Sequence, residues 1–589
     1  MRIRKIYFIL LVIPLVLGSC EELLDPENDN HITIDQISGN PSYAQGLLLN
    51  VYAMLPTNNF NYSDVATDNA VINNKLSPYV RMATGQWSAL YNPVSQWNNC
   101  NSAILYLNKF LEDFVDSVAW KWSNDELNSM YIRRFKGEAY ALRGLFEYYL
   151  LATAGGVGAD NQMLGFSIYN KFLNADDDFN IPRATFTQSV DHIYADFNKA
   201  LEYLTMDDYV DITSASQLPP GLEGSDVTNY NMIFGLQANQ RISGRIVKAL
   251  KARVALLAAS PAFSNNDASL WEQTANFAGP LLSSIGGISG LDPTGNKFYD
   301  QTRVEAINLA SNKKDQKEII WRQAIETNNT YETANFPPSL FGNGNINPTQ
   351  NLVDAFPMAN GYPIAHASSQ YNASNPYTGR DPRLALYIAY NGNTVSGKVI
   401  TTGVGGASDA KDSIETSTRT GYYLKKMLRE DVSLNPVSKT TKKHIDVHIR
   451  YTELFLIYAE SANEAWGPDG KGAFGFSARD VIAAIRKRGG ITQPDNYLAS
   501  ISSKEDMRTL IRNERRIELC FEGFRFWDLR RWKADLTETA KGININKSKT
   551  SYTAVDVEPR LYNNDYMHYG PLPEQEIIKY DALIQNKGW

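Results

Sequence analysis

Histidine and cysteine are scarce in this chain of 589 residues, which holds 6 His and 3 Cys. So few cysteines cannot form the disulfide framework that stabilises small secreted domains. Lysine and arginine together number 57 against 64 aspartates and glutamates, which gives a net charge of -7. This acidic balance argues against a nucleic-acid-binding protein, because such a protein needs a basic surface. Hydrophobic residues make up 43% of the sequence, which supports a large folded core and excludes intrinsic disorder.

A hydrophobic run long enough to span a membrane is also missing. The longest one, Ile6 to Leu17, is shorter than the roughly 20 residues that a spanning helix needs. It follows a basic N-terminus, so residues 1–19 are predicted to be a secretory signal peptide. The sequence Leu-Gly-Ser-Cys that ends at Cys20 resembles the bacterial lipobox, which implies cleavage before Cys20 and acylation of its thiol. The alternative is an ordinary signal peptide with a chance cysteine. Glu21 and Glu22 resemble the surface-export signal of Bacteroidetes lipoproteins.

Motifs of common catalytic and metal chemistry are missing as well. His444 and His448 alternate with apolar residues, which predicts a strand, and there they lie about 13 Å apart, too far to share one metal ion. The glycines around Gly156 lack the lysine of a phosphate-binding loop, and no G-x-S-x-G elbow occurs. We therefore expect no metal, no cofactor and no catalytic residues. A glycosidase-type carboxylate pair stays open, because 64 acidic residues offer many pairs.

Apolar residues recur at three- and four-residue steps in several segments, which predicts helices packed against a core. These segments are 130–151, 245–259, 451–465 and 507–521. Residues 443–450 are expected to form a strand. Long stretches rich in Asn, Gly, Pro and Ser lie between the helices and predict loops that are functional or poorly ordered. They are residues 58–85, 207–240 and 328–361, with 401–420 expected to be a mobile surface loop.

Blocks of sequence follow one another in a recognisable order along nearly the whole chain. They include FKGEAYALRGLFEYYLLATAGGVG from Phe135, IRNERRIELCFEGFRFWDLRRWK from Ile511, and the closing PLPEQEIIKYDALIQNKGW. In this order they resemble the SusD/RagB family of bacterial outer-surface nutrient-binding lipoproteins. The resemblance implies a mainly α fold, in which a tetratricopeptide-like scaffold of helix pairs carries long irregular loops and a few short strands. It also implies an N-terminal domain over residues 20–300 and a C-terminal domain over 301–589.

The resemblance implies a function as well. It implies a lipid-anchored, non-catalytic glycan-binding protein of the outer membrane that works as a lid on a TonB-dependent transporter of the SusC type and delivers the captured glycan to it. A sugar ring has an apolar face that covers an aromatic ring, while its hydroxyls pair with polar side chains. The alternatives are the same architecture binding peptide or another nutrient, and a surface glycoside hydrolase.

Candidate ligand residues come from the same resemblance. In starch-binding relatives one ligand loop follows a Thr-Asp motif, here Thr67-Asp68, and a second follows a Glu-Ile-Ile strand, here residues 318–320. Ile72 and Asn74 stand where those relatives have tryptophans. A solvated or packed loop side chain is the alternative for each candidate. The candidates are Asn73, Asn74, Tyr79 and Arg81 in the first loop, and Tyr331, Phe336 and Phe341 in the second.

Other conspicuous residues are expected to belong to the scaffold. The arginines and glutamates of the block 511–533 are predicted to pair and fix how helices dock, with Gly523 ending the helix, rather than to form a catalytic site. Cys100 and Cys520 are expected to be buried thiols. Trp87, Trp97 and Trp321 are expected in the core, and Trp466 could serve either the core or the site.

Overall fold

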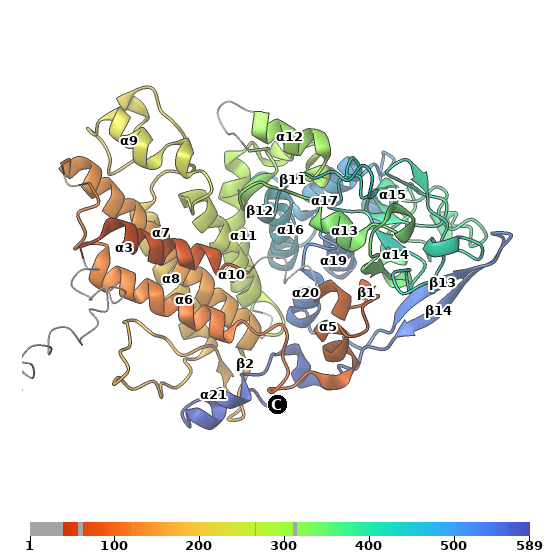
Figure 1. Ribbon diagram of the computed structural model, residues 1–589, viewed down its shortest axis with the longest axis horizontal. Helices are drawn as coiled ribbons and strands as arrows, with labels where there is room; N and C mark the ends of the chain where they lie inside the picture. The colour runs from red at the N-terminus through yellow and green to blue at the C-terminus, as the bar shows by residue number, and fades with distance from the viewer. Residues whose placement is uncertain (1–38, 57–62, 122, 265–266, 310–314) are drawn as a thin grey trace, which may run out of the picture.

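Helices dominate the protein, as expected for a mainly α fold (Figure 1). The computed structural model describes residues 39–56, 63–121, 123–264, 267–309 and 315–589. The predicted signal peptide and Cys20 lie outside these residues. No helix in the described part of the chain is both long and apolar enough to cross a membrane.

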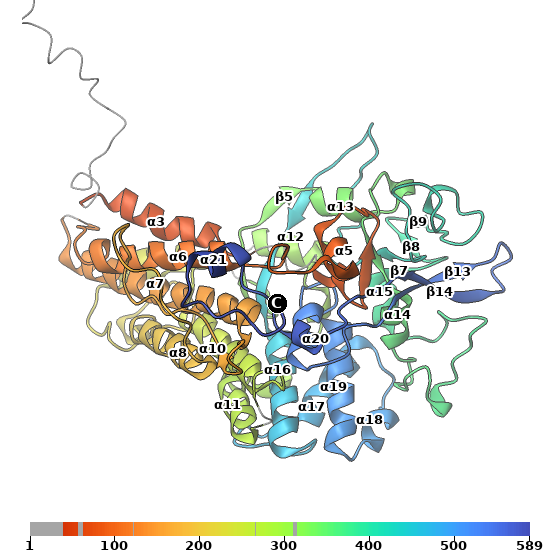
Figure 2. The ribbon, with the colours of Figure 1, turned by 90° about the horizontal axis from the view of Figure 1, so that it is seen from below.

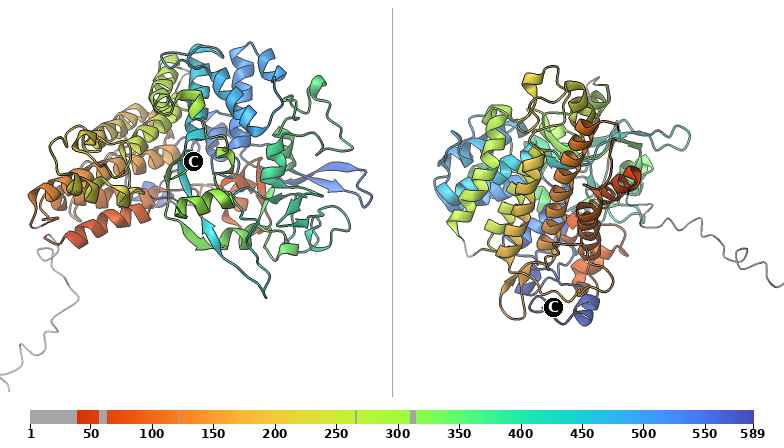
Figure 3. Two further views of the ribbon diagram at one scale, coloured as in Figure 1. Left: turned by 90° about the horizontal axis from the view of Figure 1, so that it is seen from above. Right: turned by 90° about the vertical axis from the view of Figure 1, so that its left-hand side faces the viewer.

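Long helices stack side by side and form the scaffold (Figure 3). Along the stack α6 packs on α7, α7 on α8, α8 on α10, α10 on α11, and α11 on α16, which also contacts α17 and α19. This succession agrees with the helix-pair scaffold that the resemblance implied. The bounds are α3 (Pro41–Ala53), α6 (Trp97–Lys109), α7 (Asp125–Ala154), α8 (Phe186–Tyr203), α9 (Val227–Phe234), α10 (Gly244–Ala259), α11 (Ala268–Ser284), α16 (Tyr451–Trp466), α17 (Ala478–Gly489) and α19 (Lys504–Glu518).

The longest helix, α7, shows why this sequence forms such a stack. The side chain of Asn124 accepts a hydrogen bond from the backbone N–H of Leu127 and so caps the N-terminus of the helix. Gly144 lies where α7 crosses α8, and a Cβ atom there would come within 2.8 Å of the Phe197 ring. The missing side chain therefore lets the two helices approach closely.

Most of the predicted helices are confirmed. Segments 130–151, 245–259 and 451–465 lie in α7, α10 and α16. The prediction for 507–521 was wrong at its end, because α19 stops at Glu518 and not at Gly523. Phe521 and Gly523 both have positive φ, which no continuing helix allows. The turn leads into a short helix, α20 (Arg525–Arg531).

The described strands are short and form seven two-stranded sheets. β4 (Ile319–Arg322) pairs with β12 (Val447–Arg450), and β5 (Glu326–Asn328) pairs with β11 (Lys442–His444). The predicted strand over 443–450 is thus two strands with a break between them. β13 (Ala540–Ile545) and β14 (Tyr552–Glu558) form a hairpin that projects from the end of the molecule farthest from α7 (Figures 1 and 2).

The loop 401–420 is more firmly held than its composition predicted. Thr418 and Thr420 are buried, and the hydroxyl of Thr418 donates to the carbonyl oxygen of Tyr422 over 2.7 Å. Within the same loop, the Asp409 carboxylate accepts hydrogen bonds from Ser339, which belongs to a different segment. Small hydroxyl side chains therefore anchor this segment to the body of the protein.

One hydrophobic cluster contains residues from both halves of the chain. Leu145 and Phe197 of the N-terminal half belong to it, as do Leu454 and Ile482 of the C-terminal half. A domain boundary near residue 300 stays a prediction. The buried positions expected for Trp87, Trp97, Trp321, Cys100 and Cys520 are confirmed, and both thiols are free.

Candidate functional site

A short antiparallel pairing joins the two predicted ligand loops. β1 (Ala70–Ile72) pairs with β6 (Ile346–Pro348), so Ile72 lies opposite Ile346. Just beyond β1, the side-chain amide of Asn73 donates to the carbonyl oxygens of Asn343 and Gly344, over 2.6 and 3.0 Å. The loop after β1 and the loop before β6 therefore lie side by side, although they are far apart in the sequence.

Some of the predicted ligand residues are exposed on these loops. Asn74 is exposed, and the Phe341 side chain keeps 56% of its surface exposed at a position with a φ of 65°. Asn73 is half-buried because it ties the loops together. Arg81 is exposed and lies over the Tyr91 ring, with its guanidinium carbon 4.3 Å from the ring centre. Its Nε also donates to the side-chain oxygen of Gln86 over 2.8 Å. An exposed aromatic ring and an exposed amide on joined loops are suited to a sugar face and its hydroxyls.

Two other predicted ligand residues are buried. Phe336 is only 1% exposed and packs into a hydrophobic cluster with Tyr423 and Leu428. Tyr79 is 8% exposed and belongs to a second cluster. Both rings support the loops from beneath, because loops this long need apolar anchors. Ile72, which stands where starch-binding relatives have a tryptophan, is also buried, in strand β1.

Tyr331 faces a different place from the exposed loop residues. It follows β5 at the start of the short helix α13 (Thr330–Asn335), and its hydroxyl donates to the Asp446 carboxylate over 2.9 Å. Both side chains line a cavity of about 190 Å³ in the middle of the protein. Burial raises the pKa of Asp446, although the hydrogen bond from Tyr331 opposes this shift.

The cavity lies between the helix stack and the C-terminal half. Its walls come from α7 and α10 on one side, and from β11, β12 and α20 on the other, elements that meet near the centre of Figure 1. Its lining is mixed, because aromatic rings alternate with charged groups. The aromatic members are Tyr148, Tyr149, Phe263, Phe298, Tyr299, Tyr331, Phe524 and Trp527, and the charged ones include Arg253, Arg450, Arg515, Arg530, Arg531, Asp446, Glu453, Glu522 and Asp528.

The carboxylates on the cavity wall are mostly held by arginines. Glu453 forms a two-pronged pair with Arg253, with distances of 2.6 and 2.8 Å. Glu522 is paired in the same way with Arg450, over 2.7 and 2.8 Å. Burial alone would raise the pKa of Glu522, but Arg450 and Lys426 outweigh it and lower the pKa. A carboxylate held ionised in this way cannot donate a proton as a general acid.

The charged block 511–533 forms a buried network, as predicted, but with partners from other elements. Glu518 contacts Arg383, Arg450 and Arg488, the last at 2.6 Å. Burial favours the neutral form, but these guanidinium groups outweigh it and lower the pKa of Glu518 to about 2. Since Glu518 is fully buried, this network fixes how α19 docks on the neighbouring segments.

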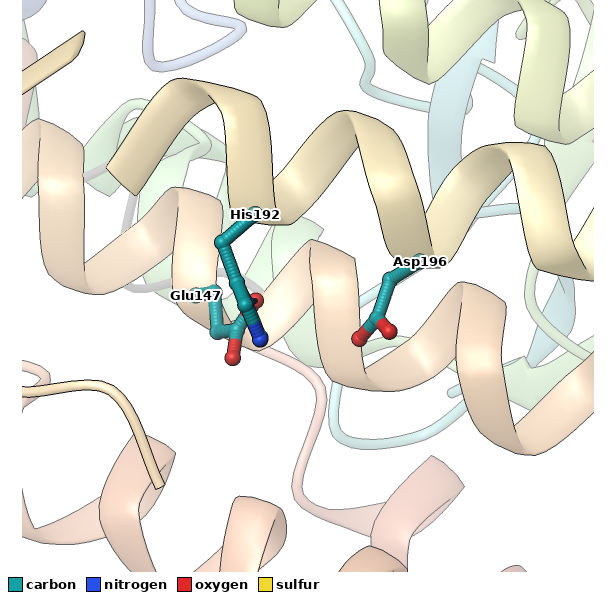
Figure 4. A group of neighbouring side chains, drawn as sticks. All are labelled: Glu147, His192 and Asp196. Atoms are coloured by element: carbon teal, nitrogen blue, oxygen red, sulfur yellow. Dashed lines mark hydrogen bonds and ion pairs between the residues drawn. The ribbon is translucent and has the colours of Figure 1, made fainter. Parts of the chain in front are cut away.

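A third cluster, between α7 and α8, has the spacing of a metal site (Figure 4). Glu147, His192 and Asp196 each offer an atom within 4.8 Å of the others. However, Asp196 already holds Arg143 through two contacts of 2.7 Å. The ring nitrogens of His192 face oxygens of Glu147 and Asn170, at 3.0 and 2.6 Å, which suits an imidazolium that donates to both. Burial lowers the pKa of His192, yet the hydrogen bond to Glu147 outweighs burial and the pKa is raised. Arg143, Asn170 and the members of the cluster hold most of these polar atoms, although one buried oxygen of Glu147 has no described partner, and we assign the cluster to the scaffold.

The histidines of β11 and β12 also have separate partners. The imidazole of His444 lies 3.0 Å from a Glu332 carboxylate oxygen, whereas His448 lies against the Trp321 ring with centres 4.4 Å apart. Burial lowers the pKa of His448 to about 4, so this ring is neutral at physiological pH.

Sequence reasoning missed most of the cavity residues. Tyr148 and Trp527 lie in segments whose helical period predicts core, and a core position looks the same as a cavity wall in such a pattern. One feature of the sequence could have pointed to a charged cavity wall: the segment 525–533 has more arginines than acidic residues.

Comparisons with known proteins agree with this architecture. The family model described as "SusD family" matches residues 313–589, and the one described as "Starch-binding associating with outer membrane" matches residues 23–217. A curated relative, the SusD-like protein P2 of Formosa agariphila, is 29% identical over 143 residues, which is 24% of this chain and about a quarter, 25%, of the relative's length.

Solved structures cover nearly the whole chain. A SusD-like protein of Bacteroides fragilis has a TM-score of 0.70 and 23% identity over 96% of this chain and 100% of its own. A SusD-like carbohydrate binding protein of the same species has a TM-score of 0.67 and 18% identity, covering 93% of this chain and 99% of its own. The SusD homolog of Bacteroides thetaiotaomicron has a TM-score of 0.62 and 17% identity, covering 95% and 100%. With two family models matching successive parts of the chain and this shared fold, the protein belongs to the SusD/RagB family.

Proposed function

We propose that this protein captures glycans at the cell surface without cleaving them and delivers them to a TonB-dependent outer-membrane transporter of the SusC type. Membership of a family that includes starch-binding proteins associated with the outer membrane supports glycan as the ligand class. The observation that carries the proposal is the β1–β6 pairing, which brings the two ligand loops together.

The joined loops have the composition of a sugar-binding surface. Phe341 offers an exposed ring, and Asn74 and Arg81 offer hydrogen-bonding groups from the neighbouring loop. The hydrogen bonds of Asn73 hold the loops in place before a ligand arrives, which lowers the entropy cost of binding. Such a site needs no group with a shifted pKa, since no bond is broken.

The proposed binding surface is tested by calorimetry with a panel of oligosaccharides and peptides. We expect at least one oligosaccharide to bind, and Phe341→Ala to weaken it roughly five- to tenfold, the usual worth of one stacked aromatic ring. Val437→Ala is the matched control, because Val437 is 96% exposed on a separate loop. Binding of peptides alone, or equal glycan affinity in Phe341→Ala, would contradict the proposal.

The absence of cleavage has its own test. The purified protein should leave the length of a bound oligosaccharide unchanged after long incubation. Shortened products that disappear in Asp446→Asn would instead identify a hydrolase, since the pKa of Asp446 is raised as a general acid requires.

The anchoring part of the proposal rests on the sequence up to Cys20. An acylated cysteine would tether the folded body to the outer membrane, because several acyl chains bury enough CH₂ groups for stable attachment. Cys20→Ala should release the protein from the membrane fraction. Membrane attachment that persists in this variant would remove the lipid anchor from the proposal.

A further inference from the structure

A buried cation without an anionic partner lies in the wall of the central cavity. Arg530, in α20, is 3% exposed, and within the described ranges it forms no ion pair with any carboxylate. Its Nε donates to the His568 carbonyl oxygen over 2.9 Å, and its Nη1 has no hydrogen-bond partner among the described groups. A buried charge without an anionic partner is costly, because burial removes the water that would solvate it and no carboxylate takes the place of that water.

Aromatic rings surround this guanidinium. The rings of Trp87, Phe526 and Trp527 lie with their centres 5.2 to 5.3 Å from the guanidinium carbon of Arg530. Cation–π contacts of this kind offset part of the cost of burial, but the N–H groups of Nη1 still have no described acceptor. Burial lowers the pKa of Arg530 to about 9, so the side chain is still charged at physiological pH.

A second guanidinium in the same wall is also only partly satisfied. The Nε of Arg515 donates to the Asp528 carboxylate over 2.7 Å, but its Nη1 has no partner in the described part of the chain. Asp528 is shared, because Arg531 contacts its other oxygen over 2.8 Å. Arg531 is further paired with Glu460. Arg515 and Arg531 are thus both paired with carboxylates, whereas Arg530 is not.

We propose that the central cavity binds a small carboxylate with a ring-shaped body, such as a single acidic sugar unit. The carboxylate accepts hydrogen bonds from Arg530, whose flat fork of N–H groups matches its two oxygens, and Arg515 supplies a further donor. The body of the ligand packs against the rings of Tyr148 and Trp527. A volume of about 190 Å³ suits a molecule of this size.

The charge balance favours a carboxylate over phosphate. Arg530 carries one positive charge without a carboxylate partner in the described part of the chain, and a monoanion would neutralise it, whereas a phosphate dianion would leave a buried negative charge. The aromatic rings in the mixed lining also favour a ligand with an apolar face. This inference concerns the cavity alone and does not depend on glycan capture by the surface loops.

Calorimetry on the mature chain tests the proposal, with D-glucuronate as the probe and D-glucose and inorganic phosphate as comparisons. We expect saturable binding of D-glucuronate that is at least tenfold tighter than that of either comparison. Arg530→Met should weaken it at least tenfold. Equal binding of D-glucose, tighter binding of phosphate, or no saturable binding of D-glucuronate would overturn the proposal.

Variants separate the cavity from the surface loops and from a loss of folding. Arg530→Met should fold with an unchanged or higher melting temperature, because it removes an unpaired buried charge. Should it not fold, Arg515→Lys keeps the positive charge but removes Nη1, and a D-glucuronate affinity unchanged in that variant would count against the site. Phe341→Ala should leave D-glucuronate binding unchanged, whereas Arg530→Met should leave binding of oligosaccharides to the loops unchanged. A result that contradicts the cavity proposal would therefore leave the proposal of glycan capture by the surface loops intact, and the reverse also holds.

Discussion

Buried ionisable side chains in this protein differ most in whether they have a partner. Glu518 lies among arginines and stays ionised, whereas Asp64 is equally buried but forms no ion pair with a described side chain. The same type of group therefore has opposite pKa shifts, because desolvation acts on both and only one is compensated. Replacing Asp64 or Arg530 should, for this reason, not destabilise the fold.

Asp64 makes the stability of the protein depend on pH. Burial raises its pKa from 3.8 to about 7, although backbone N–H groups of Phe521 and Gly523 oppose the shift. The folded state therefore holds a proton that the unfolded state has lost, and stability falls as pH rises from about 4 to 7. Asp64→Asn should stabilise the protein more at pH 8 than at pH 5, by on the order of 2 kcal/mol.

Thermal unfolding at these two pH values measures the effect. Asp191→Asn, at an exposed position of α8, is the matched control and should shift the melting temperature equally little at both. A gain from Asp64→Asn that is the same at pH 5 and pH 8 would show that the carboxyl is not protonated in the folded protein.

At the scale of elements, the charged network around Glu518 decides how α19 docks. Three arginines from different elements converge on this carboxylate, namely Arg383 in α15 (Pro382–Tyr387), Arg450 at the end of β12, and Arg488 in α17. Replacing one member leaves the remaining charges buried and unbalanced, which costs more than the pair itself contributes.

Glu518→Gln should therefore destabilise the protein by about 3 kcal/mol or more. The loss should appear as a clear drop in the melting temperature at pH 7. Glu505→Gln is the control on the same helix, since its side chain is 84% exposed and its pair with Arg508 should contribute less than about 1 kcal/mol. Similar melting temperatures for both variants would mean that the network does not hold α19 in place.

Helices and strands differed in how far the sequence could predict them. The period of α7, α10 and α16 was readable because their large apolar residues recur at helical spacing, although α16 is buried on every side from Tyr451 to Glu464. β1 and β6 have only three residues each and are separated by nearly half of the chain, so no local pattern reveals their contact. For the same reason the sequence named Asn73, Asn74 and Phe341 but could not separate them from the buried Tyr79 and Phe336.

The cavity shows the same limit at a finer level. Sequence pattern predicted that the arginines of the block 511–533 pair with carboxylates, and for Arg531 this is confirmed. Arg530, the next residue in the chain, has no such partner, because its side chain leaves α20 in another direction. Neighbouring arginines cannot be told apart until the packing around each is known.

At the scale of the whole molecule, the C-terminal tail returns to the N-terminal half. The backbone N–H of Lys587 donates to the Val157 carbonyl oxygen over 2.8 Å, next to the end of α7 (Figure 2). Arg183 is buried and donates to the Ile584 carbonyl oxygen and to Asn586, each over 2.9 Å. The closing segment of the sequence therefore packs against the segment that follows α7.

Asn586 links the C-terminal tail to the N-terminal half, and replacing it should lower the free energy of unfolding of the whole protein. Its amide donates to the carbonyl oxygens of Ala154 and Gly570, over 2.8 and 2.6 Å, and its oxygen accepts from Arg183. Asn586→Ala leaves these buried groups without partners, at a cost of about 3 kcal/mol. The adjacent Lys587→Ala, at an exposed position, should leave the melting temperature nearly unchanged. Limited proteolysis of Asn586→Ala should then cleave near residues 155–165 faster than in Lys587→Ala. Equal cleavage rates would mean that the tail merely rests on the N-terminal half and does not stabilise it.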